Sequence, residues 1–167
     1  HEKEFAAKGG PFEMVQLWVN LPSENKLAAP RYQTLEADKM NSVELNNQAG
    51  KINIIAGECD GTKGTASTFT PINVFDIRLN KDGKTNFNIP SVHNTCLLVI
   101  DGSIEVNGQS VSKHGFAYFD NEGDEINIKA NENSVILFLS GEPINEPIAQ
   151  YGPFVMNQFG DSFQCLA

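Results

Sequence analysis

The 167-residue sequence has no long hydrophobic run and is poor in basic residues. No apolar stretch approaches the roughly 20 residues that a membrane-spanning helix needs, so we expect a soluble protein without a membrane partner. Twelve Lys and Arg stand against 21 Asp and Glu, which gives a formal net charge of -9. Such a charge repels phosphate backbones at long range, and we therefore expect no direct binding to nucleic acid.

Cysteine is also scarce. Cys59, Cys96 and Cys165 are odd in number, far apart and outside any CxxC or Cys/His cluster, so they indicate neither a disulfide framework nor a zinc site. We interpret them as free thiols in a reducing compartment and expect a cytoplasmic protein, although a protein with free cysteines can also be exported. Cys96 lies in an apolar run and is predicted to be a small core residue instead of an activated thiolate.

Helical periodicity is nearly absent, and the chain after residue 50 is a series of short runs that favour strands. Turns that place Gly beside Asp, Asn or Glu separate these runs. The pattern predicts an all-β antiparallel sandwich or barrel. The predicted strands cover residues 51–58, 72–79, 84–89, 95–100, 103–106, 115–119, 125–129 and 134–139.

The first fifty residues are less regular. Alternation of apolar and polar residues predicts a strand over residues 12–21, and both faces of that strand carry bulky apolar groups that require cover. The following segment predicts one helical turn capped by Ser23 and stopped before Pro30, and a second short turn lies within residues 35–40. Residues 41–50 are polar enough to be a linker.

The strand and turn order of residues 72–141 resembles a cupin, a small double-stranded β-helix or jelly-roll barrel. Two further segments narrow the resemblance. EMVQLWVNLP at residues 13–22, with PRYQ at 30–33, is similar to the inter-domain segment of pirins. GEPINEPI at 141–148, with YGPFVMN at 151–157, is similar to the C-terminal segment of pirins. Over roughly residues 5–157 the chain is identified as a member of this family.

Pirins are bicupins, and the chain has about half the length that such a protein requires. In the family, an N-terminal cupin holds one metal, usually iron, through an HxH pair and a later HxE pair, and the second cupin holds none. The resemblance implies that residues 1–40 are the remnant of the first cupin and the inter-domain segment. Residues 41–50 are then the linker, residues 51–146 the C-terminal cupin barrel and residues 147–167 the tail. The end of the tail departs from the family pattern, so we expect a partial gene product.

The cupin metal motif can be laid on this sequence directly. The first motif, G-x5-H-x-H-x3-E-x6-G, fits from Gly83 to Gly102 and places its ligand positions on Ile89, Ser91 and Thr95. The histidine of the second motif falls near Phe119. Isoleucine and phenylalanine donate nothing to iron and hydroxyls alone are poor ligands, so we expect a barrel without a metal or other cofactor.

Three histidines occur in the chain, and none is predicted to be a ligand. His1 precedes a glutamate pair with the wrong spacing for HxE, and we interpret it as an exposed terminal residue. His93 and His114 lie in predicted turns without a second histidine on the same strand face. We expect both to be ordinary solvated loop residues.

What the resemblance implies for the intact parent is an iron-binding bicupin. Its activity would be quercetin 2,3-dioxygenation or a redox-linked role in transcriptional coregulation through a protein partner, while the half seen here should be catalytically silent. The alternative is a non-catalytic interaction module that forms a homodimer through residues 12–21. Its predicted interaction residues are Gln16, Trp18, Tyr151, Phe154 and Met156. A self-standing cupin that binds a small ligand is a third possibility, disfavoured by the predicted apolar lining at Ile89, Leu97 and Phe119.

Overall fold

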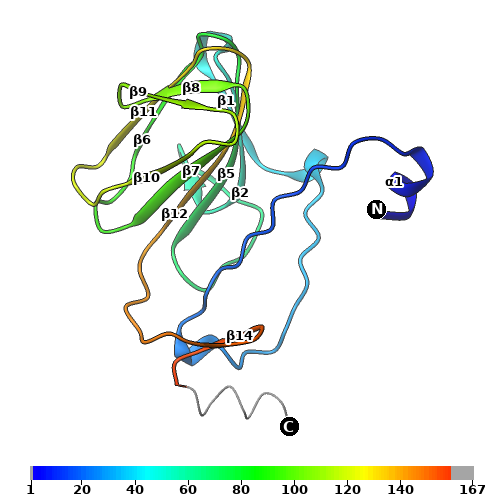
Figure 1. Ribbon diagram of the computed structural model, residues 1–167, viewed down its shortest axis with the longest axis vertical. Coiled ribbons are helices and arrows are strands. Elements are labelled where there is room, and N and C mark those ends of the chain that lie inside the picture. The colour runs from blue at the N-terminus through cyan, green and yellow to red at the C-terminus, as the bar shows by residue number, and fades with distance from the viewer. Residues whose placement is uncertain (1, 159–167) are drawn as a thin grey trace.

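The fold is a sandwich of two antiparallel β-sheets preceded by a long N-terminal segment, residues 2–41, which we call the arm (Figure 1). The computed structural model describes residues 2–158. The larger sheet has the strand order β1-β2-β5-β12-β7-β10, and the smaller sheet has the order β6-β11-β8-β9. The strands of the larger sheet are β1 (Ser42–Leu45), β2 (Gly50–Ala56), β5 (Ile72–Leu79), β7 (Asn94–Asp101), β10 (Phe116–Phe119) and β12 (Ser134–Gly141). Those of the smaller sheet are β6 (Lys84–Asn88), β8 (Ser103–Val106), β9 (Gln109–Ser112) and β11 (Glu125–Ala130).

The remaining elements are short. A helix α1 (Glu2–Lys8) begins the described chain, and three 3-10 turns cover Ser23–Asn25, Ala37–Lys39 and Asn46–Gln48. Two small hairpins pair β3 (Glu58–Cys59) with β4 (Thr62–Lys63) and β13 (Ala149–Tyr151) with β14 (Phe154–Met156). In the described part of the chain, no helix has both the length and the apolar character needed to cross a membrane.

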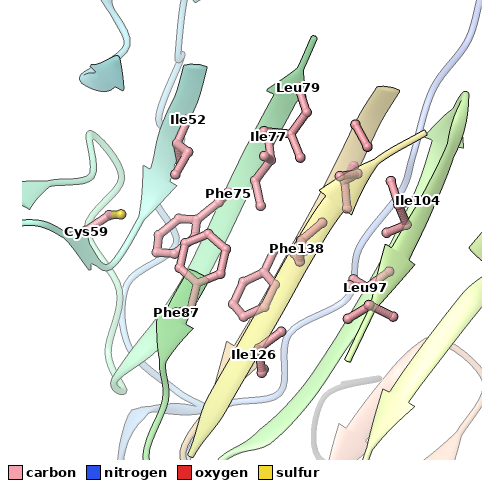
Figure 2. Close-up of a cluster of buried hydrophobic side chains, with 14 of the residues drawn as sticks. Ile52, Cys59, Phe75, Ile77, Leu79, Phe87, Leu97, Ile104, Ile126 and Phe138 are labelled. Atoms are coloured by element: carbon pink, nitrogen blue, oxygen red, sulfur yellow. The ribbon is translucent and has the colours of Figure 1, made fainter. Parts of the chain in front are cut away.

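The core lies between the two sheets, and β12 is at its centre. Alternate residues of β12 are buried along the whole strand because successive side chains point to opposite faces. Phe138 pairs across the ladder with Phe75 on one side and Leu97 on the other. Its ring centroid lies 5.7 Å from that of Phe75 and 4.8 Å from that of Phe87, which comes from the opposite sheet. These stacked rings form the middle of the core (Figure 2).

The predicted all-β cupin architecture is confirmed, and each of the eight predicted strands has a counterpart within two residues at either end. The turns follow their residue types. Asn107 and Gly108 both have positive φ, at 47° and 81°, as the two-residue turn between β8 and β9 requires. That turn creates β9, a strand that the sequence analysis missed because its residues are mostly polar and lie at a sheet edge.

Two predictions for the N-terminal region are wrong. Residues 12–21 form no strand; the segment is extended and pairs with no sheet among the described residues. Residues 41–50 are not a linker, because β1 joins the larger sheet by pairing with β2. Val43 and Leu45 pack against the core while Glu44 between them faces outward, so the sequence analysis interpreted a half-buried edge strand as a polar linker.

The predicted turns before residue 41 are partly confirmed. Short 3-10 turns do form at Ser23–Asn25 and Ala37–Lys39. Ser23 does not cap the first of them, since Pro22 occupies the capping position and no side chain caps the turn. The Ser23 hydroxyl is instead bonded to a distant carboxylate.

Candidate functional site

The open end of the barrel holds a small cavity of about 50 Å³. Ile89, Ser91, Thr95 and Phe119 all line this one cavity, although they come from three different places in the chain. These are the four positions to which the sequence motif assigned the metal ligands. The fold therefore brings the motif positions together in the way the spacing predicts, with the wrong side chains for a metal.

Two polar residues that line this cavity, His93 and Thr95, both bond to Ser140. Thr95 and Ser140 are cross-strand partners on β7 and β12, and the Thr95 hydroxyl donates to Ser140 Oγ at 3.3 Å. Ser140 Oγ also lies 3.1 Å from His93 Nδ1. Thr95 and Ser140 are buried, and His93 is half-buried. The prediction that His93 is a solvated loop residue is thus wrong, because a serine 47 positions away holds its ring.

Iron does not fit this mouth. Ile89, which is 7% exposed, and Phe119 have no donor atom, and the two buried hydroxyls already bond to each other. Across residues 2–158 there is no group of three or more His, Cys, Asp or Glu side chains placed to hold a metal ion. His114 is exposed in a turn next to the Lys113–Asp101 ion pair, and His1 lies outside the described residues. No catalytic step can be written through a metal at these residues.

A second feature is an apolar groove of about 500 Å³ on the outer face of the larger sheet. The arm forms one wall with Leu17, Trp18 and Val19. The floor and the far wall come from the sheet and the chain that follows it, and include Val74, Cys96, Leu139, Ile144 and Ile148. The Trp18 side chain remains 65% exposed. A groove of this size with two apolar walls is a candidate binding surface.

One carboxylate fixes the arm beside this groove. Glu146 Oε2 accepts a hydrogen bond from the backbone N–H of Ser23 at 2.8 Å, and Glu146 Oε1 accepts one from the Ser23 hydroxyl at 3.1 Å. The Asn157 side-chain amide also donates to Glu146 Oε2, at 2.8 Å. Lys26 Nζ donates to Asn20 Oδ1 at 2.6 Å and to the Val155 carbonyl at 3.0 Å. We use the name Glu146 clamp for five of these residues: Ser23, Lys26, Glu146, Val155 and Asn157.

These bonds favour the ionised form of Glu146. The backbone N–H of Ser23 lowers the pKa of Glu146 most, and the Ser23 hydroxyl, the Asn157 amide and the Lys26 charge lower it further. Since the pKa of Glu146 in the folded chain is below its ordinary value of 4.5, the stabilisation from its bonds to Ser23 and Asn157 is fully present above about pH 4.5. This stabilisation is lost as the pH falls through the lowered pKa.

Glu146→Gln should therefore release the arm at neutral pH. We expect faster hydrogen exchange at the Ser23 amide, because a neutral amide oxygen is a weaker acceptor than a carboxylate. In the wild type we expect the arm to be released as the pH falls below about 4.5, and this pH dependence should be absent from the variant. Glu142→Gln, at an exposed position of the same segment, is the matched control and should leave both properties unchanged. Equal exchange at Ser23 in wild type and Glu146→Gln would contradict the clamp.

Comparison with known proteins shows to which protein family this barrel belongs. The family profile described as "Pirin C-terminal cupin domain" matches residues 74–161, a little over half of the chain. The chain belongs to the pirin family. The predicted membership, and the assignment of the barrel as the C-terminal cupin of a pirin, are confirmed.

Curated relatives include both bacterial and human pirin-like proteins. A Pseudomonas aeruginosa protein named "Putative quercetin 2,3-dioxygenase PA2418" is 39% identical over 157 residues, which is 94% of this chain and 55% of the relative. Human "Pirin" is 31% identical over 153 residues, covering 88% of this chain and 52% of the relative. The chain thus spans a little over half the length of these pirin relatives.

A solved structure matches nearly the whole chain. The crystal structure of a quercetin 2,3-dioxygenase from Acinetobacter baumannii is 41% identical and aligns with a TM-score of 0.93. The alignment covers 99% of this chain and 58% of that one. Because nearly the whole chain is aligned, the match includes the arm.

The five predicted interaction residues of this pirin fall in two regions, Gln16 and Trp18 in the arm and Tyr151, Phe154 and Met156 in the hairpin of β13 and β14. Trp18 lines the groove, whereas Gln16, Tyr151, Phe154 and Met156 are not among the lining residues. Gln16 and Tyr151 are exposed, and Phe154 and Met156 are half-buried in the terminal hairpin. The sequence analysis missed the sheet residues of the groove and missed Glu146, whose only signal was an acidic residue in a segment otherwise rich in Pro and Ile.

The two described cysteines are free, as predicted. Burial raises the pKa of Cys59 to about 11, with a further contribution from Asp60, so this thiol stays protonated at neutral pH. Burial also raises the pKa of Cys96. Cys96 is not a core residue, however, because it is half-buried on the outer face of the sheet and lines the groove. Cys165 lies outside the described residues.

Proposed function

We propose that this chain is the C-terminal cupin half of a pirin with quercetin 2,3-dioxygenase-type activity, and that this half holds no metal of its own. The observation that carries the proposal is the barrel mouth, where all four motif positions meet and hold Ile, Ser, Thr and Phe. The names of the bacterial relatives support the activity of the whole protein. The iron chemistry would then belong to the other cupin of the parent.

The role of this half, on the proposal, is to hold the arm and the groove in place for that other cupin. The arm presents extended backbone and apolar side chains that no sheet of the described chain covers. Such a segment is suited to receive strands of a further domain. A redox-linked regulatory role for the parent, through a protein partner, stays a prediction, as does the cytoplasmic location.

Metal content tests the proposal directly. After incubation with Fe²⁺ under reducing conditions and gel filtration, we expect far less than one iron per chain and no consumption of quercetin. The full-length Pseudomonas aeruginosa relative, treated in parallel, is the control for metal loading and for the assay. One iron per chain in this protein, retained through gel filtration, would contradict the assignment of a metal-free barrel.

The second candidate function is a homodimer through residues 12–21. The observation in its favour is the exposure of Phe12, Met14 and Trp18, each of which keeps about two thirds of its side-chain surface open to solvent. On this reading a second copy covers the arm. A Trp18→Lys variant places a charge in the middle of that contact and should make such a dimer dissociate.

A further inference from the structure

A different surface of the molecule carries a free strand edge. β10 is the last strand of the larger sheet, bonded to β7 on one side and to no other strand of the described chain (Figure 1). The side chains of β10 point alternately toward solvent and toward the core. Phe116 and Tyr118 are 60% and 62% exposed, whereas Ala117 and Phe119 pack against the core.

The strand itself carries little protection. Natural edge strands are blunted by an inward-pointing charge, a proline or a bulge, or they are covered by a loop or helix. β10 has the sequence Phe-Ala-Tyr-Phe, without a charged residue or a proline. A bulge at His114 and Gly115, which both bond to Val99, precedes it, and over residues 116–119 its pairing with β7 is in regular register. Two exposed aromatic rings therefore lie beside a row of backbone groups that are available to another strand.

We propose that β10 pairs with β10 of a second copy of this chain, which joins the two larger sheets into one continuous sheet. A two-fold axis perpendicular to the sheet makes the pairing antiparallel and self-complementary. The inference does not depend on the proposed function, and it uses residues other than those of the arm.

The alternation of the strand restricts the register, because paired residues must lie on the same face of the joined sheet. Among the registers that meet this condition, we propose the one in which Phe116 faces the partner's Tyr118 and Tyr118 faces the partner's Phe116, because it sets two aromatic pairs directly opposite each other. Ala117 then lies on the two-fold axis. A shift by one residue would place an exposed ring opposite a core-facing side chain, which excludes the neighbouring registers. Aromatic pairs directly opposite each other are among the favourable cross-strand contacts.

Charge at the two ends of the strand fits the same arrangement. Lys113 and His114 precede β10, and Asp120 and Glu122 follow it. Antiparallel pairing brings the basic end of one copy to the acidic end of the other. Lys113 already bonds to Asp101 at 2.8 Å, so the added attraction is moderate. The net charge of -9 on each copy opposes association, and salt that screens this repulsion should strengthen the dimer.

Sedimentation equilibrium over a range of concentrations measures this association. Because one four-residue strand pair is a small interface, we expect a dimer that dissociates in the upper micromolar range. Phe116→Lys and Tyr118→Lys should each weaken it by at least about tenfold, since they place like charges near the axis. Both side chains are exposed, so circular dichroism should show an unchanged fold. Trp18→Lys is the matched control and should leave this dimer intact.

A cysteine at the axis tests the register. In a background with Cys165→Ser, Ala117→Cys should form an inter-chain disulfide under mild oxidation, because opposed Cα atoms lie within disulfide distance. Asn86→Cys, on the other sheet, should not. A monomer at every accessible concentration would overturn the proposal. A dimer that is dissociated by Trp18→Lys but not by Tyr118→Lys would also overturn it, because that result would place the dimer contact on the arm.

Discussion

Three histidines introduced at Ile89, Ser91 and Phe119 should convert the barrel mouth into a site that binds about one Zn²⁺ or Ni²⁺ per chain. The structure places all three positions around one cavity. Three imidazoles with one open position form a common zinc site. The apo variant should be less stable than the wild type, because Ile89 is a buried residue of the core cluster. Added metal should then raise its melting temperature, while the wild type shows no such rise.

Isothermal titration calorimetry and metal analysis after gel filtration measure the effect. The control carries Ile89→His and Phe119→His but leaves Ser91 unchanged, so it has the same loss of core packing with one ligand fewer. It should bind metal at least about tenfold more weakly. A folded triple variant with no metal affinity would show that the cupin motif has been laid on Gly83 to Gly102 in the wrong register.

Phe138→Ala should be the most destabilising single truncation in the core. Phe138 is fully buried, and its ring packs against Phe75 and Phe87, so its loss removes a ring contact between the two sheets. Truncation of a buried phenylalanine costs about 3–5 kcal/mol. That is a large part of the roughly 5–15 kcal/mol by which domains of this size are stable.

Urea unfolding followed by circular dichroism measures this cost. Phe116→Ala is the matched control, because it removes the same ring from the same sheet at a position 60% exposed, and it should cost less than about 1 kcal/mol. Similar midpoints for the two variants would mean that the stacked rings do not hold the sheets together.

Local patterns were enough to predict the barrel. β5 and β8 were predicted with the bounds that the structure gives, because alternating side chains and flanking turn residues are both local signals. The arm shows the limit of such signals. Residues 12–21 have the alternation of a strand, but a strand also needs a partner strand, and in the described chain this segment pairs with none. Pairing depends on the rest of the molecule and cannot be read from ten residues.

The residues of the candidate site, too, could be predicted from the sequence only in part. The glycine spacing of the cupin motif located all four mouth positions, because spacing along two adjoining strands fixes which side chains meet. The contact of His93 with Ser140 and that of Ser23 with Glu146 could not be predicted. Each joins residues far apart in the chain, and neither pair has a distinctive sequence pattern. The groove was missed for the same reason, since its walls come from the arm and from three strands.

The position of the Glu146 clamp has a mechanical consequence. Within the clamp, Glu146 bonds to Ser23 of the arm and to Asn157 after the terminal hairpin, and Lys26 of the arm bonds to Val155 of that hairpin. These bonds lie outside the stacked rings of the core. A displacement of the hairpin would therefore be passed on to the arm, whose Trp18 lies in one wall of the groove.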